Sequence, residues 1–263
     1  MEEPRLVASD VDGTLLDPMA RLTERTGRAV ANVVASGTPF VLVSGRPPRW
    51  ITPIAELANL DGLAVCANGA VLYDIAEDKV LATRELDPVL LTDVATALDE
   101  VLPGVHFAAE RSAAPEFLTE HGYTNPWGDA ERNPASRAEL LGRPAIKLLA
   151  WHPGMTSQAM ADAARAVLDG AVDVTFSTNS GLIECSATGV TKAFGLAEVC
   201  SRLDIPAEAV IAFGDMPNDV EMLRWAGHGV AMANAHPAAV EAADELTGTN
   251  AEDGVAQVLE RWF

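Results

Sequence analysis

The sequence predicts an α/β protein in which a Rossmann-like parallel sheet, covered by helices on both faces, is interrupted by an inserted α+β unit. Short apolar runs alternate with helical patterns at both ends of the chain, whereas the middle of the chain loses this alternation. With 263 residues, 49% of them hydrophobic, the chain is long enough to bury the cores of two such units.

The N-terminal part is predicted to form three buried strands separated by two helices. The apolar runs that predict these strands are 6–8, 40–43 and 63–66. Thr23 is expected to cap the first helix and Gly37 to end it. Pro47 and Pro48 open the second helix, which runs to about Asn59. Nearly continuous apolar strands joined by helices are typical of a parallel sheet that is buried on both faces.

The middle part has strands that are not each followed by one crossover helix. Strands are expected at 105–110, 145–151, 172–177 and 182–186, and helices at 87–101 and 156–168. The stretch 121–144 is rich in Gly, Pro and Asn and has no clear period. This pattern indicates a separate α+β unit with a mixed or antiparallel sheet.

The alternating pattern returns after Thr188. Helices are expected at 191–203, from Pro217, and near His236 and Glu252, with strands at 209–213 and 229–232. We therefore expect a core made of residues 1–82 and 187–263, and an inserted domain of residues 83–186.

Net charge and cysteine content indicate which partners and which compartment to expect. A net charge of −20 disfavours binding to nucleic acid and to anionic membranes. The three cysteines lack the spacing of a zinc site or a disulfide framework, so we expect buried thiols in a reducing compartment. No signal-peptide pattern or membrane-spanning apolar run is visible, and a cytoplasmic location is expected. The oligomeric state stays open.

Two acids stand at the end of the first predicted strand, in the stretch Ser9–Thr14. Asp10 and Asp12 are two residues apart, so on an extended backbone both side chains leave on the same face. Their carboxylates repel each other unless a cation or a proton lies between them. Asp, Gly and Thr are also common turn residues, so this stretch alone leaves a plain turn as an alternative.

Three further polar groups follow at predicted strand ends or helix starts. They are Ser44-Gly45-Arg46, Lys192, and Gly214-Asp215 with Asn218-Asp219. Each has an ordinary explanation as a turn, a surface helix residue or a helix cap. Together they supply a hydroxyl, a cation and further acids at the carboxyl ends of parallel strands, where open α/β sheets bind ligands.

This set of motifs resembles the haloacid dehalogenase (HAD) superfamily of phosphotransferases, whose pattern is DxDGT, a strand-terminal Ser or Thr, Lys, and an acidic GDxxND-type loop. The insertion resembles the α/β (C2-type) cap of Cof-type (IIB) phosphatases. Asn68-Gly69-Ala70, Glu184 and Gly189-Val190-Thr191-Lys192 also match that subgroup. Ala193 departs from it, because the subgroup usually has glycine after the lysine.

The resemblance implies a role for each matching residue. Asp10 would be the nucleophile and, with Asp215 and the backbone carbonyl of Asp12, would hold Mg²⁺. The Asp12 side chain would act as general acid and base. Ser44 and Lys192 would contact the transferring phosphoryl group and complete the catalytic set.

Other matching residues would support these. Asn218 and Asp219 would orient the metal's waters and Lys192. The residues expected to bind substrate or phosphate are Gly45, Arg46, Asn68 and Gly69. Candidates for choosing the substrate are Arg49, His106, His121, Tyr123, Trp127, Lys147 and Glu184, although such residues more often serve packing or the surface.

The expected function is a Mg²⁺-dependent phosphatase that hydrolyses a small phosphorylated metabolite, such as a sugar phosphate, through an aspartyl-phosphate. A phosphohexomutase of the same superfamily is an alternative that the core motifs do not separate from it. A regulator that binds phosphometabolites without turnover is a further alternative, although such a protein would not need the nucleophile.

Overall fold

The computed structural model describes residues 3–112, 114, 116–124 and 133–263. The chain divides into two compact units. Unit 1 contains the chain up to Ala82 together with Thr191–Phe263, and unit 2 contains Thr83–Val190.

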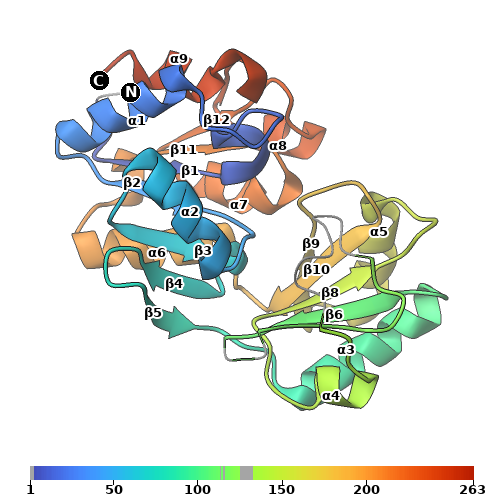
Figure 1. The fold of residues 1–263 in the computed structure, drawn as a ribbon. Coiled ribbons are helices and arrows are strands. Elements are labelled where there is room, and N and C mark those ends of the chain that lie inside the picture. Colours follow the sequence, from blue (N-terminus) through green and yellow to red (C-terminus); the bar gives the residue numbers. More distant parts are fainter. Residues whose placement is uncertain (1–2, 113, 115, 125–132) are drawn as a thin grey trace. The chain divides into compact units, whose positions relative to one another are not determined.

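Unit 1 is built on an eight-stranded sheet with the order β13-β12-β11-β1-β2-β3-β4-β5 (Figure 1). Pairing is parallel from β13 through β3 and antiparallel between β3 and β4. The strands are β1 (Leu6–Ser9), β2 (Phe40–Val43), β3 (Leu63–Cys66), β4 (Val71–Asp74), β5 (Lys79–Thr83), β11 (Val210–Gly214), β12 (His228–Ala231) and β13 (Glu245–Leu246). The predicted α/β class with a mostly parallel sheet is therefore confirmed.

Helices cover this sheet on both faces, which is why its central strands are apolar along their whole length. One group comprises α1 (Glu24–Ala35), α2 (Pro48–Ala58) and α9 (Gly254–Leu259), with α1 in contact with the other two. A second group comprises α6 (Lys192–Leu203), α7 (Val220–Trp225) and α8 (Pro237–Ala242), with α7 in contact with the other two. Leu6 and Ala8 pack into one core cluster with Leu196 of α6 and Met222 of α7.

The β4–β5 edge of the sheet was not predicted from the sequence. After β3, the short turn η2 (Ala67–Gly69) reverses the chain and β4 returns antiparallel to β3 without a crossover helix. β5 is partly exposed and begins and ends with the polar residues Lys79 and Thr83, so it lacks the continuous apolar run of a buried strand. β13 has two residues, too few to give a sequence pattern.

Unit 2 contains a five-stranded sheet with the order β7-β6-β8-β10-β9, in which the neighbours pair antiparallel. The strands are β6 (His106–Glu110), β7 (Phe117–Thr119), β8 (Lys147–Trp151), β9 (Val172–Thr175) and β10 (Leu182–Ala187), and the helices are α3 (Pro88–Val101), α4 (Arg137–Leu141) and α5 (Ser157–Leu168). α3 and α5 contact each other, and α5 contacts β9 and β10. The prediction of an α+β insertion with its own sheet is confirmed.

Two elements of unit 2 escaped the sequence analysis because they are short. β7 has three residues, and α4 has five. α4 depends on a capping box in which Ser136 and Glu139 bond each other's backbone N–H groups. Such local capping shapes the stretch 133–144, which shows no hydrophobic period.

The helix starts predicted at Thr23, Asp87 and Thr156 are confirmed, and each of the three residues caps its helix. Thr23 accepts a hydrogen bond from the Thr26 N–H at the start of α1, and Asp87 and Thr156 cap α3 and α5 in the same way. The three cysteines are buried free thiols, as predicted. In the described parts of the chain, no helix has the length and apolarity needed to cross a membrane.

Candidate active site

The site begins where β1 ends. Asp10 directly follows the strand, and residues Val11–Leu15 form a tight turn that carries Asp12 and Gly13. Gly13 has φ +80°, and a Cβ atom there would lie 2.3 Å from Oδ2 of Asp215. Only glycine fits that position, because any side chain would be strained and would displace a carboxylate of the neighbouring strand.

Lys192 reaches this strand end from the first residue of α6. Thr191 caps the helix by accepting a hydrogen bond from the Phe194 N–H, which fixes where α6 starts. The Lys192 side chain is 0% exposed, and its Nζ lies 2.6 Å from Oδ1 of Asp10 and 2.6 Å from Oδ1 of Asp219. One buried ammonium therefore bridges two buried carboxylates that are far apart in the sequence.

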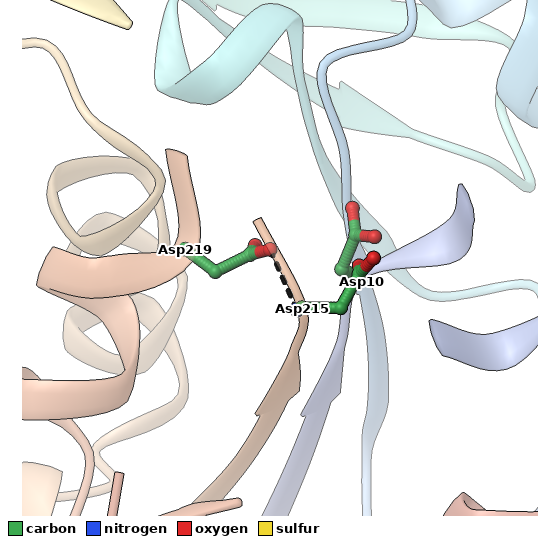
Figure 2. Close-up of side chains that lie close together, drawn as sticks. All are labelled: Asp10, Asp215 and Asp219. Atoms are coloured by element: carbon green, nitrogen blue, oxygen red, sulfur yellow. Dashed lines mark hydrogen bonds between the residues drawn. The ribbon is translucent and has the colours of Figure 1, made fainter. Parts of the chain in front are cut away.

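The loop after β11 supplies the other two acids of the site (Figure 2). Oδ2 of Asp219 accepts hydrogen bonds from the N–H groups of Asp215 (3.0 Å) and Met216 (2.9 Å). Both Asp219 oxygens are thus used within the protein. Oδ1 of Asp215 accepts from the Thr14 hydroxyl at 2.9 Å, which ties this loop to the turn after β1.

Charge in this cluster is unbalanced. Asp10, Asp215 and Asp219 are buried around one lysine, and carboxylate oxygens of the three lie within 4.8 Å of one another. Burial raises the pKa of Asp10 well above its usual value, against the lowering effect of Lys192. Burial and the charge of Asp219 raise the pKa of Asp215 to about 7. Burial alone lowers the pKa of Lys192, but its two carboxylate partners raise it above the ordinary value.

These donors fit a small hard cation. Three buried carboxylates surround one ammonium, so the cluster carries more negative than positive charge, and Mg²⁺ prefers oxygen ligands of this kind. Because both oxygens of Asp219 are used by Lys192 and the backbone, Asp10 and Asp215 are the carboxylates available to such an ion.

The end of β2 contributes Ser44 and Arg46. Ser44 is buried, and its hydroxyl accepts a hydrogen bond from the Arg46 N–H at 3.1 Å. The Arg46 guanidinium grips the carboxylate of Asp12 with two donors, Nε to Oδ2 at 2.7 Å and Nη2 to Oδ1 at 2.6 Å. This pairing of two predicted site residues was not expected from the sequence.

A third strand end, after β3, contributes Asn68 and Gly69. Ala67, Asn68 and Gly69 all have positive φ angles, of 51°, 57° and 99°. A Cβ atom on Gly69 would lie 2.0 Å from the Thr191 carbonyl oxygen, so glycine allows this turn to pack against the start of α6. Contact of Gly69 with phosphate stays a prediction.

The same turn is joined to the loop after β11. Nδ2 of Asn218 donates to Oδ1 of Asn68 at 3.0 Å, and Gly45 lies against the same Asn68 side chain. Oδ1 of Asn218 is buried and accepts no hydrogen bond from any described residue. The ends of β1, β2, β3 and β11 thus bring the predicted residues of unit 1 together, as the parallel order of these strands requires.

Sequence reasoning missed two side chains that hold the turn after β1. Asn234 donates from Nδ2 to the Gly13 carbonyl oxygen at 2.9 Å, and Asn250 donates to the Leu16 carbonyl oxygen at 2.8 Å. Asn234 follows the end of β12, so the rule that polar residues after parallel strands mark a site could have found it. Asn250 carries no comparable sequence signal.

The remaining substrate candidates occupy varied places. Lys147 and Glu184 form a buried ion pair in unit 2, and Glu184 also accepts from Ser177. His106 stacks on Trp151, Tyr123 packs edge-on to the same ring, and His121 is exposed. The Arg49 guanidinium lies 5.4 Å from the ring of Trp50. Trp127 lies outside the described residues.

Comparison with known proteins agrees with this geometry. The model of the haloacid dehalogenase-like hydrolase family matches residues 7–259. The 5-amino-6-(5-phospho-D-ribitylamino)uracil phosphatase YcsE of Bacillus subtilis is 28% identical over 271 residues, covering 98% of this chain and 95% of the relative. The pyridoxal phosphate phosphatase YbhA of Escherichia coli is 29% identical over 269 residues, covering 97% of each chain.

A solved structure extends the likeness to the fold. The HAD subclass IIB sugar phosphatase BT4131 superposes with a TM-score of 0.83 at 22% identity, covering 98% of each chain. At this identity the likeness supports the arrangement of the chain and leaves the substrate open.

Proposed function

The chain belongs to the haloacid dehalogenase-like hydrolase family, and we propose that it is a Mg²⁺-dependent phosphatase of small phosphorylated metabolites. The observation that carries this proposal is the bridge from Lys192 to Asp10 and Asp219, beside the buried Asp215. This bridge supports the proposal because it joins a carboxylate that could act as nucleophile to a fixed cation, with an acid that could bind a metal beside them. Phosphoryl transfer depends on such positioning and charge neutralisation.

In the first half-reaction, an oxygen of Asp10 attacks the phosphorus atom of the substrate. The bond from phosphorus to the leaving oxygen breaks, and Asp12 gives a proton to that oxygen. Lys192 holds Asp10 in place and offsets negative charge on the transferring group, because its ammonium lies 2.6 Å from the nucleophile. The Ser44 hydroxyl and the Gly45 N–H are proposed to donate to the phosphoryl oxygens.

In the second half-reaction, water attacks the phosphorus atom of the aspartyl-phosphate. The bond between Asp10 and phosphorus breaks, free phosphate leaves, and Asp12 accepts the proton of the water. Asp219 holds Lys192 and the backbone of the loop after β11 in position. The carboxylates of Asp10 and Asp215 and the carbonyl of Asp12 would hold Mg²⁺, which neutralises phosphoryl charge when bound.

Unit 2 is proposed to be the cap domain that selects the substrate, and unit 1 the catalytic core. The proteins that resemble this chain include phosphatases of a phosphorylated ribityl compound and of pyridoxal phosphate, which supports a small phosphomonoester as substrate. A net charge of −20 supports a small ligand over nucleic acid or an anionic membrane. The three cysteines are buried free thiols, which supports a reducing compartment, and we propose a cytoplasmic location.

The test is a screen for phosphate release from many phosphorylated metabolites, run with Mg²⁺ and with EDTA. We expect release with Mg²⁺, loss of release with EDTA, and no release by Asp10→Asn. Isomerisation of a hexose phosphate without phosphate release would contradict the hydrolase and support a mutase. Tight binding of a phosphometabolite without turnover would instead support a regulator.

A further inference from the structure

The pairing of Arg46 with Asp12 has a consequence for the proposed reaction. Arg46 approaches Asp12 with Nε and Nη2, each bonded to a different carboxylate oxygen at 2.7 Å and 2.6 Å. Such a two-donor grip fixes the plane of a carboxylate, which a single charge contact does not do. Within the described part of the chain, no other hydrogen bond to the Asp12 carboxylate is found.

Asp12 depends on Arg46 for its orientation, because packing around its side chain restricts it little. Its side chain is 56% exposed, whereas that of Arg46 is 23% exposed. A half-exposed aspartate without a partner samples several rotamers, and only those that face the reacting atoms can exchange a proton with them. Asp10 differs, because burial and Lys192 already hold it.

Arg46 is itself well anchored. Its N–H donates to the Ser44 hydroxyl at 3.1 Å, and its carbonyl accepts from the Ala67 N–H at 2.9 Å. One guanidinium nitrogen, Nη1, also lies 3.5 Å from the Trp50 carbonyl oxygen. The backbone of Arg46 is thus fixed between the ends of β2 and β3, and its guanidinium can transmit that fixed position to Asp12.

We propose that Arg46 is a positioning residue that orients the Asp12 carboxylate to accept the proton of water in the second half-reaction. This inference rests on the proposed function. A carboxylate offers about four lone pairs, and the Arg46 grip uses two of them, one on each oxygen. Each oxygen therefore keeps a lone pair to receive the proton while water forms its bond to phosphorus and the Asp10–phosphorus bond breaks. The arginine fixes the direction of that lone pair.

Kinetics can distinguish two roles for Arg46, the positioning of Asp12 and the binding of the substrate's phosphate. If Arg46 acts through Asp12 on the second half-reaction, its loss slows the breakdown of the aspartyl-phosphate, an intermediate that all substrates share. If it binds the substrate's phosphate instead, its loss weakens the first half-reaction and raises KM. The two roles therefore differ in which step and which kinetic constant they change.

The experiment is rapid-mixing kinetics of the Mg²⁺-loaded full-length protein with p-nitrophenyl phosphate, with acid quenching to count the phosphoenzyme. For Arg46→Gln we expect kcat to fall by about tenfold or more, with a burst of about one nitrophenol per active site and accumulated phosphoenzyme. Because p-nitrophenolate leaves without needing a proton from Asp12, the first half-reaction should be little affected, so KM should fall with kcat and kcat/KM should stay within about threefold of the wild-type value. Arg46→Lys should also show the burst, because lysine restores the charge but not the two-donor grip.

Two further variants make the test specific. Arg25→Gln removes an arginine that grips Glu260 with the same two-donor geometry at an exposed place, and it should show wild-type kinetics. In an Asp12→Asn background, Arg46→Gln should lower the residual rate of phosphoenzyme breakdown by less than about twofold, because its partner is already lost.

A higher KM with lower kcat/KM and no burst would overturn the inference and assign Arg46 to phosphate binding. Full rescue by Arg46→Lys, or an undiminished effect in the Asp12→Asn background, would overturn it as well. Each of these results needs a wild-type enzyme that releases phosphate. If the wild-type protein releases none from any phosphomonoester, the proposed function fails, and this inference fails with it.

Discussion

Two buried lysines, one in each unit, form ion pairs of different character. Lys192 in unit 1 meets Asp10 and Asp219, which come from loops at strand ends, with Asp215 beside them. Lys147 in unit 2 meets Glu184 inside a regular antiparallel sheet, where the two lie on the neighbouring strands β8 and β10. Both lysines are buried, so burial of a charge does not by itself distinguish the candidate active-site cluster of unit 1 from the ion pair of unit 2.

The two lysine clusters differ in the backbone that carries their acids. Residues in regular strands are held by ladder hydrogen bonds, whereas residues just past strand ends stand on loops that can admit a ligand. The acids around Lys192 also outnumber it, and burial raises the pKa values of Asp10 and Asp215, so a further positive charge would stabilise both carboxylates. The comparison indicates that a candidate site differs from an ordinary ion pair in two ways. Its charged residues lie just past strand ends, and its negative charge is not balanced by the protein's own cations.

The largest expected effect is that of Asp10→Asn on turnover. Removing the proposed nucleophile should lower kcat by about 10³-fold or more while the circular dichroism spectrum is unchanged, because the amide keeps the size of the carboxylate. Asp162→Asn, an exposed change on α5 in unit 2, is the matched control and should keep full activity. Near-normal activity of Asp10→Asn would exclude the covalent mechanism.

The next largest expected effect is that of replacing Lys192 on the stability of the protein. Lys192→Met leaves buried carboxylates without their cation, which should lower the free energy of unfolding by about 3–5 kcal/mol without Mg²⁺. Adding Mg²⁺ should recover part of this loss, because a second cation can offset the same charge. Urea unfolding with Mg²⁺ and with EDTA measures both quantities. A stability equal to that of the wild type would show that the bridge contributes nothing to the fold.

The lysine of unit 2 should behave differently. Lys147→Met should lower the free energy of unfolding by about 3 kcal/mol, because the buried carboxylate of Glu184 loses the ammonium of Lys147. Adding Glu184→Gln should restore about half of that loss or more, since a neutral amide tolerates burial better than a carboxylate. Urea unfolding of both variants gives the numbers. If Glu184→Gln lowered the free energy of unfolding further, the loss caused by Lys147→Met would not come from the buried charge of Glu184.

The smallest expected effect is a pH dependence of stabilisation by Mg²⁺. The pKa of Asp215 is about 7 in the folded protein, above the value of about 3.9 expected when unfolded. Between these values the metal-free folded state binds more protons, so its stability falls as pH rises through this range. Mg²⁺ replaces those protons, and it should raise Tm by several degrees more at pH 8 than at pH 5.5.

Thermal unfolding at the two pH values, with Mg²⁺ and with EDTA, checks this expectation. Asp215→Asn should lose much of the stabilisation by Mg²⁺ and of its pH dependence, because an amide neither titrates in this range nor supplies a carboxylate ligand, while Asp10 with its raised pKa accounts for what remains. An equal gain in Tm at both pH values for the wild-type protein would mean that protons and Mg²⁺ do not compete at this cluster. The Lys147 pair offers no comparable metal response, which sharpens the contrast between the two units.

Much of the fold was predictable because its signals are local. The apolar runs of β1, β2, β3 and β11 and the capping residue Thr23 act over a few positions, and the structure confirms them. The polar groups that follow those strands could also be placed, because parallel strands bring their carboxyl ends to one edge of a sheet. Edge strand β5 and the short elements β7 and α4 were missed, since exposed or very short segments leave no period in the sequence.

The sequence by itself determined which residue types stand at the strand ends, and the resemblance to a family attached expected roles to them. Only the tertiary structure decided which of them bond one another. Lys192 and Asp10 are separated by 182 positions, and Arg46 meets Asp12 across 34. Nor could the sequence show that Gly69 packs against Thr191. Such partners depend on side-chain direction and close packing between distant elements, which no local pattern records.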